Sequence, residues 1–155
     1  MIDGNKLLRA WLLTPSMDYT PGGTQINPLL PLIDAQRVWG GGLPEGFDPA
    51  AGAGIVVVRG GSGITSGGIP SDEIPLWNPH MRVTVWCNKN EFQIASDIFG
   101  AVSDWIDQRN NVSIPDIGYV IACNEVIEPQ DLKDPSTGFA TVFGFFDMSI
   151  RDFQS

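Results

Sequence analysis

The sequence contains few positive charges, and they are not clustered. Nine Lys and Arg residues stand against 18 Asp and Glu residues, so the net charge is −9 at pH 7 and the sequence pI is near 4.3. A protein that wraps a nucleic acid backbone needs clustered Lys and Arg side chains to neutralise phosphates. The composition therefore excludes a protein that holds DNA or RNA tightly.

Lysine is missing from a long part of the chain. None occurs between Lys6 and Lys89, although residues 60–68 are rich in glycine. A phosphate-binding loop of the pattern G-x-x-x-x-G-K-[ST] uses its lysine to neutralise phosphate charge. A dinucleotide-binding loop needs a helix directly after its glycines, and the pattern predicts none here. We expect no nucleotide cofactor.

The residues of common catalytic and metal sites are also scarce. The one histidine, His80, stands at the start of a predicted strand, and no G-x-S-x-G motif accompanies it. Asp131 and Asp134 flank a turn without the calcium-loop pattern, and Asp104 and Asp107 lie on the polar face of a predicted helix. We therefore expect no catalytic, cofactor-binding or metal-binding residue and a protein that is not an enzyme.

The two cysteines, Cys87 and Cys123, lie far apart in apolar strand patterns and lack metal-ligand spacing. They are expected to be buried, reduced thiols. No apolar run approaches the roughly 18 residues that span a membrane. The N-terminus lacks the basic and apolar regions of a signal peptide. These features predict a protein assembled inside a cell, with no membrane partner.

Charged residues make up only 17% of the chain, while five Trp and eight Phe are present. About 25% charged residues is typical of soluble domains. Two interpretations fit this composition. The chain is either a subunit that buries area against its neighbours or a monomer with a large aromatic core.

The hydrophobic periodicity predicts a single domain over residues 1–155. A short amphipathic helix is expected at 5–13 and a longer one at 92–106, where apolar residues recur at three and four positions. Strands are expected at 37–39, 54–59, 81–87, 119–127 and 139–151. The predicted fold class is α+β, a mainly antiparallel sheet of four to five strands with a long amphipathic helix packed on one face and a short N-terminal helix.

Extended loops are expected at 14–34 and 60–79, where Gly and Pro are frequent. Long irregular segments inside compact domains often carry function. The second loop contains apolar residues without a period, which predicts that it docks onto a partner. The strand at 139–151 is apolar on both faces, so it is either central or covered by a partner. The candidate interface residues are Ile64, Ile69, Ile74, Leu76, Trp77, Phe143 and Phe145.

The order of these elements resembles that of the tail terminator, or tail completion, proteins of long-tailed bacteriophages. The resemblance is carried by the short helix, the strand at 37–39 with the following Leu43 and Pro44, and the strands at 54–59 and 82–87. The helix at 92–106 and the hairpin turn at 134–138, Asp-Pro-Ser-Thr-Gly, complete it. It covers most of the chain as a layout. The sequence departs from a minimal member in its two extended loops.

The resemblance implies a structural, non-enzymatic protein of the virion tail or neck that is assembled in the host cytoplasm. Such a protein forms a ring, usually hexameric, that caps the finished tail tube and offers a surface for joining the DNA-filled head. Its implied partners are further copies of itself, the tail tube protein and a head-closure or connector protein. DNA passes through the channel without specific binding, and an acidic lining suits that passage because it repels phosphate.

Other functions fit the same sequence. The chain is alternatively another neck or connector protein, or a tail tube protein with a related sheet. A small α+β ligand-binding domain or enzyme with an unrecognised pocket is the third alternative. A terminator stops at one ring, whereas tube subunits polymerise into long cylinders.

Overall fold

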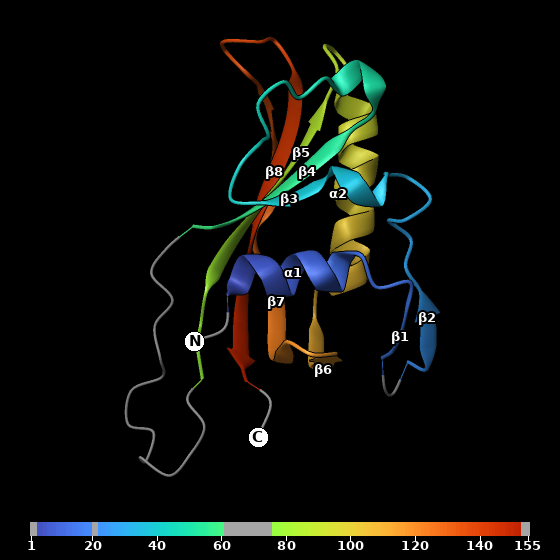
Figure 1. Cartoon of the computed structure of the whole chain (residues 1–155), viewed down its shortest axis with the longest axis vertical. Coiled ribbons are helices and arrows are strands. Elements are labelled where there is room, and N and C mark those ends of the chain that lie inside the picture. Colours follow the sequence, from blue (N-terminus) through green and yellow to red (C-terminus); the bar gives the residue numbers. More distant parts are fainter. Residues whose placement is uncertain (1–2, 20–21, 61–75, 153–155) are drawn as a thin grey trace.

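The computed structural model of the chain describes residues 3–19, 22–60 and 76–152 (Figure 1). The predicted interface residues Ile64, Ile69 and Ile74 lie outside these described ranges. In the described part, neither helix is long and apolar enough to cross a lipid bilayer.

Helix α1 (Gly4–Leu12) begins at Asp3, whose carboxylate accepts a hydrogen bond from the Asn5 amide at 3.0 Å. A carboxylate at this position satisfies one of the amides that have no partner within the helix. The apolar side chains along one face of α1 are fully buried. They are Leu7, Leu8, Trp11 and Leu12.

Helix α2 (Phe92–Ile106) has 15 residues and buries its apolar face, as the spacing of its hydrophobic residues requires. The Arg109 guanidinium donates hydrogen bonds to the carbonyl oxygens of Asp104 (3.0 Å) and Trp105 (3.3 Å). A cation there satisfies carbonyls that the last turn leaves without helical partners.

The main sheet has six strands in the order β3-β4-β5-β8-β7-β6. Neighbouring strands are antiparallel except for the parallel pair β3–β4. The strands are β3 (Val38–Gly40), β4 (Gly54–Arg59), β5 (His80–Cys87), β6 (Arg109–Ile114), β7 (Gly118–Lys133) and β8 (Ala140–Arg151). Two short 3₁₀ helices, Ala35–Arg37 and Pro49–Ala51, flank the chain around β3.

A second, two-stranded antiparallel sheet pairs β1 (Ser16–Asp18) with β2 (Thr24–Ile26). This β1–β2 hairpin follows α1 directly. It lies beside the ends of α1 and α2 (lower right in Figure 1). The Tyr19 hydroxyl ties it to α2, because it donates to the Trp105 carbonyl oxygen at 2.8 Å.

Both helices pack against the same face of the main sheet (Figure 1). Alternate residues of β5 and β8 point into this core. Gly144 of β8 lets the Phe99 ring approach the strand closely, because a Cβ atom at Gly144 would lie 2.5 Å from Phe99 Cζ. The core is continuous from α1 to the C-terminal half of β8.

The fold class predicted from the sequence is wrong. The protein is mostly sheet, with six strands of mixed direction rather than four to five mainly antiparallel ones, and its longest helix has only 15 residues. The separate β1–β2 sheet was also not expected. Strand β6 was missed because its six residues, RNNVSI, are mostly polar and directly follow a helix.

Candidate interaction surface

The six-stranded sheet has one face, here called the open face, that neither α1 nor α2 covers. Residues paired across neighbouring strands point to the same side of a sheet. The register pairs Thr84 with Phe143, Arg82 with Phe145, and Leu132 with Thr141. These positions alternate with the buried core positions of β5 and β8. Strand β8, near the middle of the sheet, therefore presents apolar side chains on both faces of the sheet, and the helices cover only one of these faces.

Aromatic side chains close one end of the open face. The Trp39 ring packs edge-to-face on Phe47 with centroids 5.6 Å apart, and Phe47 packs in the same way on Phe139 at 6.2 Å. The Arg37 guanidinium lies 5.1 Å from the Phe47 ring centroid. Gly54 lies beneath this cluster, because a Cβ atom there would lie 2.6 Å from Trp39. The remaining open face begins beside the cluster.

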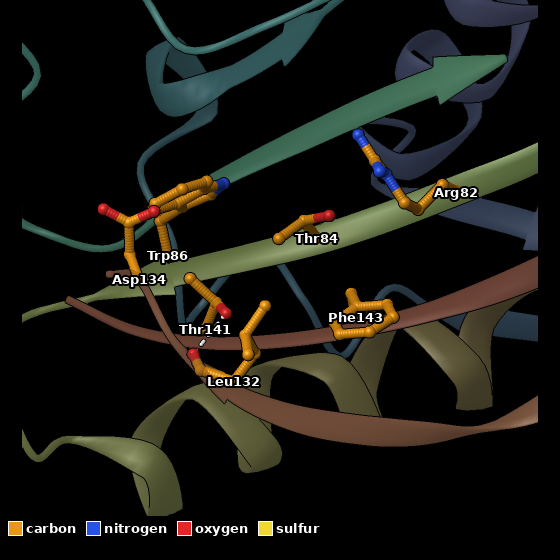
Figure 2. Close-up of a pocket in the computed structure, with 7 residues that line it drawn as sticks. All are labelled: Arg82, Thr84, Trp86, Leu132, Asp134, Thr141 and Phe143. Atoms are coloured by element: carbon orange, nitrogen blue, oxygen red, sulfur yellow. Dashed lines mark hydrogen bonds between the residues drawn. The ribbon is translucent and has the colours of Figure 1, made fainter. Parts of the chain in front are cut away.

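A groove of about 180 Å³ crosses the open face between β5 and the far half of β7. Figure 2 shows its lining, with Arg82 at one end and Trp86 and Asp134 at the other. The Thr141 hydroxyl donates to the Leu132 carbonyl oxygen at 2.5 Å and thereby fixes the β7–β8 wall. The lining residues, here called the open-face groove, are Arg82, Thr84, Trp86, Leu132, Asp134, Thr141 and Phe143.

The groove lining is mixed: Thr84 and Thr141 lie between its two ends, and Leu132 and Phe143 add apolar side chains. The Leu132 side chain is 53% exposed although it is apolar. Phe143 packs edge-to-face on Phe145 at 6.1 Å, and Phe145 in turn stacks on the His80 ring at 5.0 Å. Uncovered aromatic and aliphatic side chains of this kind are typical of surfaces that bind another protein.

The two charges of the groove differ in their surroundings. The Asp134 carboxylate accepts hydrogen bonds from the Thr137 hydroxyl and amide and from the Ser136 hydroxyl, so the pKa of Asp134 is lowered. Asp134 is thus engaged in its own turn. Arg82 is exposed, and the described residues provide it with no hydrogen bond or ion pair. Arg82 is therefore the groove charge that is available to a partner.

A histidine–aspartate pair lies beyond the groove on the same face. His80 Nδ1 and Asp147 Oδ1 are 2.5 Å apart. Two residues along β8, the Ser149 hydroxyl donates to the Asn78 side-chain oxygen at 2.8 Å. No group of three or more potential metal ligands is found among residues 3–19, 22–60 and 76–152. The pair orients His80 against Phe145, and we assign it no chemical step.

The thiols lie on the other side of the sheet and are buried. Burial raises the pKa of the Cys87 thiol to about 11, and it raises the pKa of Cys123 further. A thiol with a raised pKa is a poor nucleophile because its thiolate form is rare.

The structure brings together only part of the predicted interface. Phe143 and Phe145 are neighbours on the open face. Leu76 is half-buried, and Trp77 pairs with Ile150 through two backbone hydrogen bonds of 2.8 Å and packs against the core. Trp77 therefore points to the opposite side of the sheet from the phenylalanines.

Of the seven groove residues, the predicted interface contains only Phe143, so sequence reasoning missed the other six, among them Arg82, Trp86 and Leu132. The alternation of the predicted strand at 81–87 already places Arg82 and Trp86 together on the face opposite its apolar residues. Leu132 gave no such signal, because it stands among polar residues in the part of β7 that extends beyond the predicted strand.

No protein-family model matches the sequence, and no curated protein sequence is similar to it. The structure is similar to a chain in the solved virion of a native gene transfer agent particle. The two chains are 14% identical and superpose with a TM-score of 0.57, over 80% of this chain and 84% of that chain. The likeness shows a shared fold over most of both chains.

Proposed function

We propose that this chain is a structural subunit of a phage-like virion. The observation that carries the proposal is the shared fold with a chain of a gene transfer agent virion. The uncovered, apolar open face supports it, because a subunit of an assembly needs a surface that its neighbours cover. The role requires no catalytic group, in keeping with the sequence analysis.

Within that class we propose the more specific role of a tail terminator. A ring of this chain, most simply of six copies, caps the completed tail tube and joins it to a head-closure or connector protein. The support is the layout of elements that resembles the tail terminator family. The net charge of −9 also suits a channel that conducts DNA without binding it.

Electron microscopy of tail tubes assembled with and without this chain tests the proposal. A terminator is expected at one end of each tube as a single ring, and its removal is expected to give tubes of uncontrolled length. A distribution along the whole tube would contradict the terminator role. That outcome would support the second candidate, a tail tube subunit, which the mostly-sheet fold and a likeness to a component of a whole virion also permit.

A further inference from the structure

The second half of β7 forms an edge of the main sheet. Strand β6 pairs with β7 only from Gly118 to Cys123, whereas β8 accompanies β7 as far as Lys133. Among the strands that the structure describes, none lies on the outer side of residues 124–133. This segment, here called the outer edge, therefore presents main-chain N–H and C=O groups that no strand pairs. Such an edge is a template for pairing with another chain.

The composition of the outer edge favours such pairing. Half of the large hydrophobic residues that are exposed in the described part of the chain lie on it. They are Val126 at 45%, Ile127 at 44% and Leu132 at 53% exposure. Exposed apolar side chains on an unpaired strand promote association with a second strand. An edge of this length and composition needs features that prevent uncontrolled pairing.

The outer edge is irregular at two places. Against β8, the register of β7 shifts between Glu125 and Ile127, and again between Ile127 and Gln130. At each place β7 holds one residue more than β8 does, which is the arrangement of a β-bulge. A bulge breaks the regular spacing of the outward main-chain groups and increases the local twist of the strand. A second strand therefore pairs poorly across it.

A proline removes a hydrogen-bond donor from the same segment. Pro129 lies inside the second irregularity and has no N–H group. The hydrogen bond from the Asp134 amide to the Phe139 carbonyl oxygen, at 2.9 Å, sets the phase of the pairing between β7 and β8. It turns the main chain of Leu132 towards β8 and that of Asp131 outward, because successive residues of a strand direct these groups to opposite sides. An outward donor thus remains at Asp131.

Negative side chains protect the outer edge as well. Glu128 and Asp131 are exposed there. The Asp107 carboxylate accepts a hydrogen bond from the Glu125 amide at 2.7 Å, which satisfies a β7 amide just beyond the place where β6 ends. A second copy that approached edge to edge would bring its own Glu128 and Asp131 against these carboxylates. Like charges placed opposite each other destabilise strand pairing.

We propose that the outer edge of β7 is protected against strand pairing, and that its protecting features are Pro129, the two bulges and the acidic residues Glu128 and Asp131. These features keep the edges of two copies of this chain from joining into one continuous sheet. The inference goes beyond the proposed function and does not rest on it, because an exposed edge needs protection in a monomer and in a ring subunit alike.

The test replaces two adjacent protecting residues in the variant Glu128→Thr/Pro129→Thr. Threonine favours extended strands and supplies the missing N–H group. Thioflavin T fluorescence, which reports stacked strands, is expected to rise with time in this variant at a concentration at which the wild-type signal stays flat. The matched control is Pro44→Thr/Glu45→Thr, which makes the same two exchanges at exposed positions between β3 and β4. It is expected to behave like the wild type.

A third substitution tests whether the edge itself is responsible. Asp131→Pro, added to the Glu128→Thr/Pro129→Thr variant, removes the neighbouring outward N–H group and is expected to suppress the rise in fluorescence. Suppression despite the loss of another acidic residue would identify main-chain pairing as the cause. Urea denaturation of the freshly prepared double variant is expected to give the wild-type midpoint, because both positions are exposed.

Several results would overturn the inference. They are a double variant whose fluorescence stays flat, a control that aggregates equally, and a rise that Asp131→Pro leaves unchanged. A lowered urea midpoint of the double variant would do the same, because unfolding would then explain its aggregation. None of these measurements depends on ring formation or tube capping, so the proposed function is decided separately by the experiment on tail tubes.

Discussion

At the scale of single residues, Gly144 shows how closely the sheet and the helix layer approach. Adding one methyl group there would place it 2.5 Å from Phe99 Cζ, a distance at which the ring must move. Phe99 is only 1% exposed, so its ring is surrounded by other core atoms. The glycine thus sets the distance between β8 and α2.

Gly144→Ala is expected to lower the free energy of unfolding by about 1–3 kcal/mol, the usual cost of overpacking a core. Gly100→Ala is the matched control. Gly100 lies in α2, and a methyl group added there would meet no side chain within 4 Å, so alanine should raise the stability by roughly 0.5–1 kcal/mol through helix propensity. Urea denaturation of both variants measures this. Equal effects of the two substitutions would contradict the packing described here.

Glu125 is expected to make the stability of the fold depend on pH. Burial, and then the negative charge of Asp107, raise the pKa of Glu125 above its ordinary value of 4.5. The folded state therefore favours the protonated form, and the stability that protonation provides is lost as the pH rises from about 4.5 through the raised pKa.

Glu125→Gln is accordingly expected to be more stable than the wild type at pH 8 by a few tenths of a kcal/mol, since the side chain is partly exposed. The difference should shrink towards pH 4, where the wild-type carboxyl is protonated. Denaturation curves between pH 4 and pH 8 test this, with Glu45→Gln in an exposed loop as the control. A constant difference across that range would contradict the assignment.

At the scale of elements, one hydrogen-bond network joins α1, the β1–β2 hairpin and α2. Trp11 Nε1 donates to the Tyr19 hydroxyl, and that hydroxyl donates to the Trp105 carbonyl oxygen, both at 2.8 Å. Trp105 Nε1 donates back to the Trp11 carbonyl oxygen at 3.0 Å. Arg109 lies 4.0 Å from the Tyr19 ring centroid. The network holds the hairpin in place.

Tyr19→Phe removes the shared hydroxyl and leaves the buried Trp11 N–H without its acceptor, while the Trp105 carbonyl oxygen loses one donor and keeps the Arg109 guanidinium. We expect a loss of about 1–3 kcal/mol in the free energy of unfolding. Burial raises the pKa of Tyr19 to about 12, so the hydroxyl stays protonated and able to donate throughout the neutral range. Denaturation followed by tryptophan fluorescence checks this. An unchanged midpoint would show that the network contributes nothing.

Much at this scale could be predicted from the sequence. The apolar spacing from Phe92 to Ile106 predicted the bounds of α2, and the run Gly54–Arg59 predicted β4, because both patterns follow local periodicity. The period-two pattern of β8 also placed Phe143 and Phe145 on one face. Asp3 was a predictable cap for α1.

The remaining features depend on long-range contacts. Strand β3 has only three residues, which are too few to show that it pairs in parallel with β4. Strands β1 and β2 also have three residues each, and they lie in a segment rich in Gly and Pro that predicts a loop. Trp77 follows a Gly- and Pro-rich stretch, and an apolar residue in that place predicted a docking role. Its position against the core depends on its pairing with Ile150, which the sequence does not indicate. The groove itself needs Leu132 and Trp86 from strands far apart in sequence.

At the scale of the whole molecule, the helices cover one face of the main sheet and leave the other face uncovered in the described part of the chain. The chain carries a net charge of −9, so copies brought together repel one another over most of their surface. Association must then be driven by apolar contact at a few places. The open-face groove is one such place, because Leu132 is 53% exposed there and Phe143 lies beside it.

The central claim is that this chain is a ring-forming structural subunit, and native mass spectrometry of the wild-type chain over a range of concentrations tests it most directly. The account predicts one closed species, of about six subunits, with no longer polymers. An open-ended series of sizes would indicate a tube subunit instead of a terminator. A monomer at every concentration would contradict self-assembly of the ring in solution and would favour a ligand-binding domain.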